Sequence, residues 1–227
     1  MSRIAIILPA LNEEARIAAC LTLLQPLREQ DCELIVVDGG SDDQTVALAE
    51  PLADRIIAGS RGRAAQMNAG AGQTRGDILW FLHTDSRPPP GAANLIRAAL
   101  ARPTQQWGRF DVRLSGRHPL LRVVETLMNA RSRLTGIATG DQGIFVRREV
   151  FEQVGGYPPI ALMEDITFSR LLKRHGRPVC LRQRLTTSSR RWESNGILRT
   201  ILLMWQLRLA YFLGADPNRL ARIYYRS

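Results

Sequence analysis

The sequence contains few cysteines, few aromatic residues and no glycine-rich phosphate-binding loop. Its three cysteines, Cys20, Cys32 and Cys180, are widely spaced, so we expect reduced thiols and neither a disulfide framework nor a zinc site. The first apolar stretch leads into Pro-Ala-Leu-Asn-Glu-Glu instead of a glycine-rich turn, and no Gly-x-x-x-x-Gly-Lys segment occurs. These absences weigh against a dinucleotide-binding fold and exclude a P-loop nucleotide site.

Long uninterrupted apolar runs are also missing. The N-terminal run, residues 4–8, is too short for a signal peptide, so we expect a cytoplasmic protein. The longest apolar segment, residues 197–213, is interrupted by Arg199, Gln206 and Arg208, and falls short of the about 20 residues that span a bilayer. Its aromatic residues and neighbouring arginines leave two alternatives: a core helix packed on the sheet, or an interfacial helix among lipid headgroups.

Lysine is almost absent, and arginine carries the positive charge. Lys173 is the only lysine among 31 basic side chains, and the net charge is +10. Residues 1–113 hold 12 basic and 13 acidic side chains (net −1), whereas residues 114–227 hold 19 and 8 (net +11). A compositional bias toward arginine explains the choice of residue but not this asymmetry. The basic second half therefore predicts contact with phosphate groups or an anionic surface.

Apolar stretches alternate with helical patterns in the first half. Residues 4–8, 34–37 and 78–82 each stop at a polar residue and are typical of buried parallel strands, with a weaker strand at Arg55–Ala58. Helical patterns lie between them at about 13–28, 43–53 and 63–73. This order predicts an α/β fold with a doubly wound, mostly parallel sheet and right-handed crossovers.

The second half is less regular. It predicts a strand at 109–114, a helix at about 120–134, a strand at 143–147, a helix that begins near Glu164, and a long apolar helix after Trp192. No linker or repeat interrupts the chain, so we expect one folding unit. Ligands of doubly wound sheets bind at the carboxyl ends of the strands, and this brings residues 9–13, 38–41 and 83–85 together.

The residues at two of these strand ends can be explained either by ligand binding or by local structure. Asp38 can accept hydrogen bonds from a ribose or a base, but a strand-to-helix turn with Ser41 as N-cap explains the same residues. His83 and Asp85 project to the same side of an extended chain and can meet one divalent cation. The alternative is a loop aspartate beside a histidine that has another partner.

Several motifs together carry a resemblance. They are Pro9-Ala10-Leu11-Asn12-Glu13-Glu14, Val36-Val37-Asp38-Gly39-Gly40-Ser41-Asp42, the segment from Arg63 to Gly70, Leu82-His83-Thr84-Asp85, and the pair Glu164-Asp165. The chain resembles the family 2 glycosyltransferases over about residues 4–173. The resemblance implies the nucleotide-diphospho-sugar transferase (GT-A) fold and a Mn²⁺ or Mg²⁺ cofactor. His83 stands where the family usually has aspartate, a departure typical of a short subgroup.

The resemblance also implies roles for single residues. Asp165 is implied as the general base toward the acceptor hydroxyl, and Asp85 and His83 as metal ligands. On the acceptor side the candidates are Asp141, Gln142 and Glu164. The donor-binding candidates are Pro9, Ala10, Asn12, Glu13, Asp38, Ser41, Arg63, Asn68 and Thr84, and Arg191 joins them because its guanidinium group suits a diphosphate.

Simpler explanations stand beside some of these roles. The helix dipole alone favours two acids at a helix start, as at Glu164 and Asp165. Glycine and aspartate favour a turn on their own account, as at residues 140–143.

The predicted function is that of an inverting glycosyltransferase. It moves a sugar from a nucleoside-diphosphate sugar, for which uridine diphosphate is expected, to the hydroxyl of a lipid-linked or anionic acceptor. Residues 1–190 form the predicted catalytic domain, with a donor half at 1–113 and an acceptor half at 114–190, and residues 191–227 form a helical extension. We expect peripheral contact with an anionic membrane on its inner face.

Two other functions remain as alternatives. A non-catalytic basic protein on a degenerate transferase fold would bind nucleic acid or a membrane surface, and His83 favours it. Its nucleic-acid form is disfavoured because an aromatic content of 6% offers few stacking partners for bases. A nucleotidyltransferase shares the sheet and the metal, but its basic, glycine-rich segment after the first strand is missing here.

Overall fold

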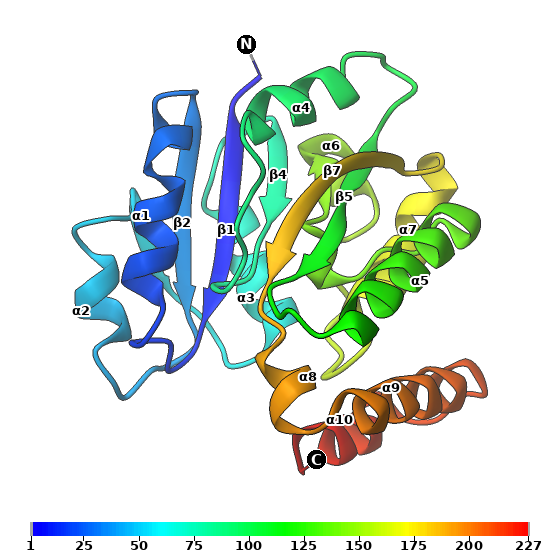
Figure 1. Cartoon of the computed structure of the whole chain (residues 1–227). Coiled ribbons are helices and arrows are strands. Elements are labelled where there is room, and N and C mark those ends of the chain that lie inside the picture. Colours follow the sequence, from blue (N-terminus) through cyan, green and yellow to red (C-terminus); the bar gives the residue numbers. More distant parts are fainter. Residues whose placement is uncertain (1, 227) are drawn as a thin grey trace.

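The computed structural model describes residues 2–226, which form one seven-stranded sheet with helices on both faces (Figure 1). The strands are β1 (Ile4–Ala10), β2 (Cys32–Asp38), β3 (Arg55–Ala58), β4 (Ile78–Phe81), β5 (Trp107–Leu114), β6 (Phe145–Arg147) and β7 (Val179–Thr187). The longer helices are α1 (Ile17–Arg28), α3 (Arg63–Gly72), α4 (Ala92–Ala99), α5 (Pro119–Thr135), α7 (Glu164–Leu172), α9 (Ile197–Phe212) and α10 (Pro217–Arg226). The short elements are α2 (Thr45–Ala49), α6 (Arg148–Gln153), α8 (Arg190–Ser194), and the 3₁₀ turns η1 (Gly140–Gln142) and η2 (Lys173–His175).

The sheet has the strand order β3-β2-β1-β4-β6-β5-β7. Strands β1 to β4 are mutually parallel, β6 runs antiparallel to both β4 and β5, and β7 pairs parallel with β5. The prediction of a doubly wound, mostly parallel α/β sheet is therefore confirmed. All four strands predicted in the first half are present.

The central strands are continuously apolar because both faces of the sheet are covered. On β1, Ile4, Ile6 and Leu8 face one layer, which contains α1 and α4, whereas Ala5 and Ile7 face the other, which contains α3, α6 and α7. Side chains on a strand alternate between its two faces, so a strand buried on both sides needs apolar residues at every position. This burial leaves only the strand ends free to carry polar, functional side chains.

The helix expected at 13–28 begins later, at Ile17. The loop before it is held by its neighbour instead: the Glu13 amide donates to Thr45 Oγ1 at 2.7 Å, and the Glu14 amide donates to Asp43 Oδ2 at 3.1 Å. Asn12 adopts a left-handed backbone conformation with φ of 53°. These bonds and the left-handed Asn12 hold residues 11–16 in bends and turns, so α1 begins only at Ile17.

Strand β7 is an element that the sequence did not predict. It lies at the edge of the sheet, pairs along β5, and has a largely exposed middle with arginines at 182 and 184. An edge strand needs apolar residues on one face only, and charged residues there are common. The weak apolar pattern of β7 follows from this position.

The three C-terminal helices form a layer beside the sheet domain (Figure 1). The start of α9 packs against the end of β5 and against α5, where Ile197 and Ile201 contact Leu114 and its neighbours. Further along, Leu207 of α9 joins a cluster that contains Leu162 and Ile166 from the α7 region and Leu220 from α10. Among residues 2–226, no helix is long and apolar enough to cross a membrane.

Candidate functional site

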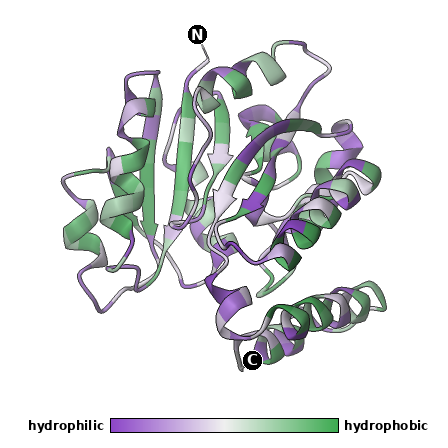
Figure 2. Cartoon of the chain, in the orientation of Figure 1, coloured by the Kyte–Doolittle hydropathy of each residue, from purple (hydrophilic) through white to green (hydrophobic). Residues whose placement is uncertain are grey.

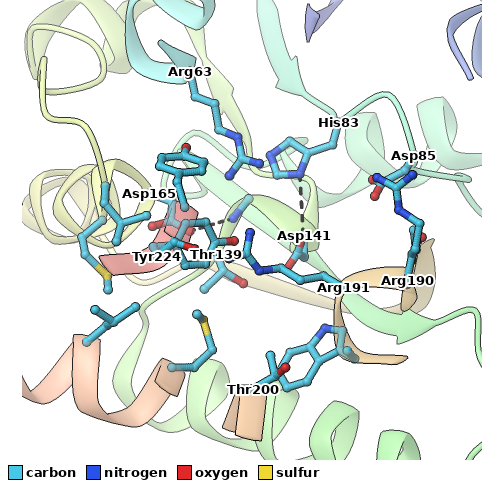
Figure 3. A pocket seen from close by; sticks show the side chains of 18 of the residues that line it. Arg63, His83, Asp85, Thr139, Asp141, Asp165, Arg190, Arg191, Thr200 and Tyr224 are labelled. Carbon is cyan, nitrogen blue, oxygen red and sulfur yellow. Dashed lines mark hydrogen bonds and ion pairs between the residues drawn. The ribbon is translucent and has the colours of Figure 1, made fainter. Parts of the chain in front are cut away.

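Two neighbouring cavities open where β1 and β4 end. The first cavity, of about 830 Å³, is lined by the loop after β1, the start of α3, the end of β4 and residues 159–161. The second cavity, of about 510 Å³, lies among η1, the start of α7 and the three C-terminal helices (Figure 3). Five residues line both cavities: Glu13, Arg63, His83, Asp85 and Tyr225. The two cavities therefore share a wall and form one cleft.

The structure brings most of the predicted site residues to this cleft. The first cavity is lined by the donor candidates Pro9, Ala10, Glu13, Arg63 and Thr84. The second is lined by Asp141, Glu164, Asp165 and Arg191. The metal candidates His83 and Asp85 lie on the wall that the cavities share. Five of the predicted residues line neither cavity: Asn12, Asp38, Ser41, Asn68 and Gln142.

Hydrogen bonds of Asp38, Ser41 and Asn12 connect the loop after β2 with the loop after β1. Asp38 accepts hydrogen bonds from the amides of Gly40 and Ser41, both at 3.0 Å, and from Ser41 Oγ. Ser41 Oγ in turn accepts the Asn12 amide at 2.9 Å, and Asn12 Oδ1 accepts the Asp42 amide at 3.1 Å. Ser41 does not cap α2, whose N-cap is Gln44. These bonds fix the loop after β1 against the loop after β2, and a ribose contact of Asp38 stays a prediction.

Asn68 and Gly70 join α3 to its surroundings. Asn68 donates to the Tyr157 carbonyl and accepts the Tyr157 amide, both at 2.8 Å, and so holds the segment that leads to α7. Gly70 faces β1 so closely that a Cβ atom would lie 2.6 Å from Ile7 Cγ2. The Asn-x-Gly pattern therefore has a structural explanation: Asn68 holds the backbone of Tyr157, and Gly70 allows α3 to approach β1 closely.

Gln66 is a residue of the site that the sequence did not single out. Its side-chain amide donates to the carbonyls of Ala10 and Val37, at 2.7 and 2.8 Å, and it lines the first cavity from α3. It ties the carboxyl ends of β1 and β2 together. A single glutamine inside a helical pattern carries no signal that would have predicted this.

Asp85 is oriented by a strand far away in the sequence. Thr187 Oγ1, at the end of β7, donates to Asp85 Oδ1 at 3.1 Å. The other carboxylate oxygen, Oδ2, has no partner among the described residues and remains available to a ligand. No three His, Cys, Asp or Glu side chains gather as a metal-binding group within residues 2–226. Asp85 and His83 thus suit a Mn²⁺ or Mg²⁺ ion that takes one or two protein ligands and completes its shell with phosphate oxygens.

Gly140 links the candidate base to His83. Its amide donates to Asp165 Oδ2 at 2.9 Å, and a Cβ atom at this position would lie 2.6 Å from His83 Nε2. His83 points toward Asp141, with 3.6 Å between Nδ1 and Oδ1 (Figure 3). Burial disfavours charge on Asp141, but the contact with His83 and the charges of Arg63 and Arg208 outweigh it and lower the pKa of Asp141.

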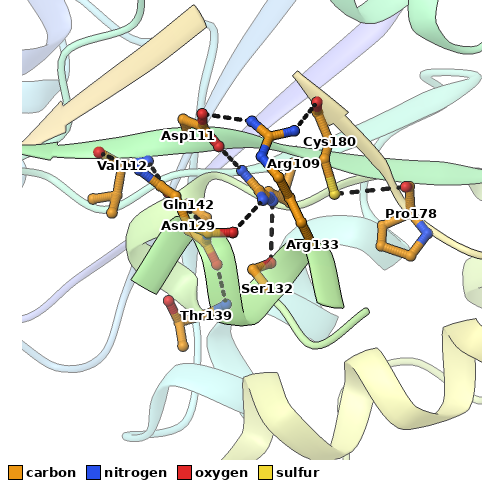
Figure 4. Close-up of polar contacts among 10 residues, drawn as sticks. All are labelled: Arg109, Asp111, Val112, Asn129, Ser132, Arg133, Thr139, Gln142, Pro178 and Cys180. Atoms are coloured by element: carbon orange, nitrogen blue, oxygen red, sulfur yellow. Dashed lines mark hydrogen bonds and ion pairs between the residues drawn. The ribbon is translucent and has the colours of Figure 1, made fainter. Parts of the chain in front are cut away.

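A polar network under the sheet edge supports the η1 turn (Figure 4). Gln142 is fully buried: its Oε1 accepts the Thr139 amide at 3.1 Å, and its Nε2 donates to Asn129 Oδ1 at 3.3 Å. Asn129 also bonds both backbone groups of Val112 on β5. Gln142 therefore positions the turn that carries Asp141, and a direct acceptor contact of Gln142 stays a prediction.

Glu164 and Asp165 begin α7 after Met163, which has a left-handed φ of 69°. Asp165 accepts the Gly140 amide on Oδ2 and the Ile166 amide on Oδ1, so it is held by two backbone donors. Glu164 is buried, and burial followed by the charge of Asp165 raises its pKa to about 7. One of two adjacent carboxyl groups is thus partly protonated near neutral pH.

The C-terminal helices contribute the predicted residue Arg191 and several residues that the sequence did not predict. Arg191 lies over the Tyr224 ring, with the guanidinium carbon 3.6 Å from the ring centroid. Helix α9 lines the second cavity with Thr200, Met204, Leu207 and Arg208. Helix α9 reaches this cavity because it packs beside the start of α7. The sequence of α9 alone does not show which element it packs against.

The chain is similar in sequence to known glycosyltransferases. A family profile described as glycosyl transferase family 2 matches residues 5–155. Among curated relatives, the undecaprenyl-phosphate 4-deoxy-4-formamido-L-arabinose transferase of Pseudomonas aeruginosa is 27% identical over 200 residues, covering 74% of this chain and 52% of that protein. The same-named protein of Photorhabdus laumondii is 28% identical over 167 residues, covering 65% and 49%. The chain spans about half the length of these relatives.

Solved structures share the fold at low identity. Glucosyl-3-phosphoglycerate synthase from Mycobacterium tuberculosis, in complex with Mn²⁺, uridine diphosphate and glucosyl-3-phosphoglycerate, superimposes with a TM-score of 0.62 and 22% identity, covering 82% of this chain and 71% of that one. Residues 1–349 of S. aureus TarS give a TM-score of 0.66 and 16% identity, covering 82% and 60%. The nucleotide-sugar transferase fold and the profile match over most of the chain agree: this chain belongs to glycosyltransferase family 2.

Proposed function

We propose that this protein is an inverting glycosyltransferase that moves a sugar from a uridine-diphosphate sugar to an acceptor held beside Asp165. The observation that carries the proposal is the shared wall of the two cavities, where His83 and Asp85 lie between the donor candidates and Asp165. A nucleotide in the first cavity would place its diphosphate at this wall. The sugar would then extend toward the second cavity, where Asp165 lies.

Asp165 is the proposed general base. Its two oxygens are fixed by the amides of Gly140 and Ile166, and each oxygen retains a lone pair that can take a proton. As the acceptor oxygen bonds to the anomeric carbon, the bond to the diphosphate breaks and the acceptor proton passes to Asp165. One displacement inverts the anomeric configuration and needs no second, nucleophilic carboxylate.

Asp85 and His83 are the proposed ligands of a divalent cation. The bond from Thr187 fixes Asp85 and leaves Oδ2 directed at a ligand. When bound, Mn²⁺ or Mg²⁺ would neutralise the negative charge that develops on the departing diphosphate. Arg63 and Arg191, which line the cleft, would add guanidinium contacts to the same phosphates.

The proposed division of the chain keeps residues 1–190 as the catalytic domain and 191–227 as a helical extension. The donor and acceptor halves meet at residue 113, inside β5. The extension completes the second cavity through α8, α9 and α10. We therefore propose that it belongs to the acceptor side of the site.

Helix α9 is the proposed membrane contact. Leu198, Leu202, Trp205, Leu209 and Phe212 recur every three or four residues along it and are each between 59% and 74% exposed. In Figure 2 the ribbon of this helix, at the edge of the molecule, is coloured as hydrophobic over much of its length. A row of apolar side chains with a tryptophan, on a strongly basic half of the chain, suits an anionic bilayer better than a second copy of the same basic surface. The proposal includes a peripheral, cytoplasmic-face location and a lipid-linked acceptor, as the names of the curated relatives suggest.

Calorimetry of nucleotide binding tests the donor assignment. Uridine diphosphate would be titrated with and without Mn²⁺ into the native protein and Asp85→Ala, with Asp77→Ala, a carboxylate outside both cavities, as the matched control. We expect Mn²⁺-dependent binding in the native protein and the control, and its loss in Asp85→Ala. No nucleotide binding with any metal would overturn the proposal and favour the non-catalytic basic protein.

A further inference from the structure

Two arginines on the acceptor side of the cleft lack partners. Arg208 of α9 lines the second cavity, and Arg131 of α5 lies near it. Neither side chain forms a hydrogen bond or a salt bridge with another residue in the described range 2–226. The Nε and Nη2 atoms of Arg131 are buried without any acceptor. Buried guanidinium groups are otherwise almost always paired, because an unpaired buried charge is unfavourable.

The electrostatics agree with this geometry. Burial, and next the charge of Arg208, lower the pKa of Arg131 to about 10, and burial also lowers the pKa of Arg208. Two like charges thus lie close together in a poorly solvated place. Asp165 is the acid whose charge favours both of them, and Asp141 favours Arg208 as well. Asp141 is also in contact with His83, so Asp165 is the acid whose charge acts on both guanidinium groups.

We propose that Arg208 binds a phosphate group of the acceptor and that Arg131, behind it, is a positioning residue that adds positive potential. The inference rests on the proposed function and assigns the acceptor side of its site. The phosphate would lie within reach of the attacking oxygen, whether that oxygen belongs to a neighbouring hydroxyl or to the phosphate itself. In the transfer step the acceptor oxygen bonds to the anomeric carbon as the bond to the nucleoside diphosphate breaks. A hydroxyl acceptor gives its proton to Asp165, whereas an ionised phosphate oxygen carries no proton and needs no base.

The surroundings of Arg208 fit such a ligand. From the same helix, Met204 and Leu207 form an apolar part of the cavity wall. Thr200 also lines the cavity, but its Oγ1 donates to the Gly196 carbonyl at 2.9 Å and so has no proton to offer an anion. A guanidinium group in a partly desolvated place binds phosphate through short, charge-assisted hydrogen bonds. The exposed apolar row of α9, which includes Trp205, Leu209 and Phe212, lies beside Arg208 on the same helix, so one helix would hold both the phosphate and, for a lipid, the membrane surface.

A simpler role for Arg208 is that of a counter-charge for Asp165. The two roles give different results. A counter-charge would alter the pH dependence of turnover on replacement but would not create a phosphate site. A phosphate-binding residue would alter phosphate affinity and the acceptor KM more than kcat.

Calorimetry with inorganic phosphate tests the inference on the full chain. Phosphate is titrated into the protein alone and into protein saturated with uridine diphosphate and Mg²⁺, so that the donor cannot compete for the measured site. The variants are Arg208→Gln and the charge-conserving Arg208→Lys. Arg199→Gln is the matched control, because Arg199 lies on the same helix, is exposed and lines neither cavity.

We expect phosphate to bind the native protein, and Arg208→Gln to weaken it about 10- to 100-fold, the range of one to two charge-assisted hydrogen bonds. Arg208→Lys should fall between, and Arg199→Gln should match the native protein. Nucleotide binding by each variant shows that it is folded. Absence of phosphate binding, or equal binding by Arg208→Gln, overturns the inference. Failure of nucleotide binding alone would instead overturn the proposed function, since phosphate is also measured without nucleotide.

Two larger probes then identify the source of the phosphate. One is soluble 3-phosphoglycerate, and the other is phosphatidylcholine vesicles that carry undecaprenyl phosphate, each compared between the native protein and Arg208→Gln. Binding of the first that depends on Arg208 indicates a soluble phosphorylated acceptor, and of the second a lipid phosphate. If neither binding depends on Arg208, the assignment of this site to the acceptor is wrong.

Discussion

Replacement of Gly140 by alanine tests whether the η1 turn holds the site together. The new methyl group would lie 2.6 Å from His83 Nε2 and 2.8 Å from Cε1, well inside van der Waals contact. The backbone of Gly140 has no positive φ, so the strain is steric and comes from the imidazole alone. Overpacking of this kind costs about 1–3 kcal/mol. For a chain of this length we expect the melting temperature to fall by about 2–12 °C.

The same change should also lower activity. Gly140 donates to Asp165 and borders His83, so a shift of a few tenths of an ångström moves the proposed base and a proposed metal ligand together. A misplacement of about 1 Å can cost about 100-fold in turnover, so we expect roughly a three- to tenfold loss for this smaller shift. The assay is release of uridine diphosphate from a uridine-diphosphate sugar, with calorimetry for nucleotide affinity, which we expect to change much less.

A control and a double variant separate the clash from other effects. Gly72→Ala lies near the end of α3 with open space around its Cβ position, so we expect it to be neutral or slightly stabilising. His83→Ala removes the clashing ring, so Gly140→Ala in that background should lose most of its effect on stability. If Gly140→Ala destabilises both backgrounds equally, or neither, then the contact with His83 is not what requires glycine.

Two further predictions concern Glu164 and the exposed face of α9. The pKa of Glu164 is raised from 4.5 to about 7 in the fold, so the folded state binds this proton more tightly than the unfolded state does. The contribution of Glu164 to the free energy of unfolding is therefore highest below about pH 4.5, and it is lost as pH rises through 7. The stability of Glu164→Gln relative to the native protein should therefore increase from pH 5 to pH 8, by on the order of 3 kcal/mol at most. A difference in melting temperature between the two proteins that does not change with pH would contradict this. On α9, Trp205→Ser with Leu209→Ser should reduce retention on anionic vesicles at low salt at least about tenfold, because two exposed apolar side chains leave the bilayer. The matched control is Leu48→Ser, exposed on α2, and equal retention of all three proteins would refute the membrane role of α9.

The first half of the chain was predictable because its signals are local. The strands at 4–8, 34–37 and 78–82 are buried on both faces, and their continuous apolar runs predict this burial. The residues after them, from Pro9 to Glu13 and from His83 to Asp85, do meet at one edge of the sheet, as parallel strands require. The edge strand β7 and the start of α1 were missed or displaced, because pairing with β5 and bonds from the α2 loop decided them.

The sequence by itself determined the family and the central strands of the sheet, and it predicted the acids of the candidate site, because motifs and continuous apolar runs are formed by neighbouring residues. Only the tertiary structure decided which motif residues line the cleft and which, such as Asn68 and Asp38, bond to other loops. It also decided that Thr187 orients Asp85, that Gly140 joins His83 to Asp165, and that Arg208 faces the cavity from a helix about forty residues beyond Asp165. These contacts join residues far apart along the chain. Their geometry depends on how helices and strands pack, and no local pattern records it.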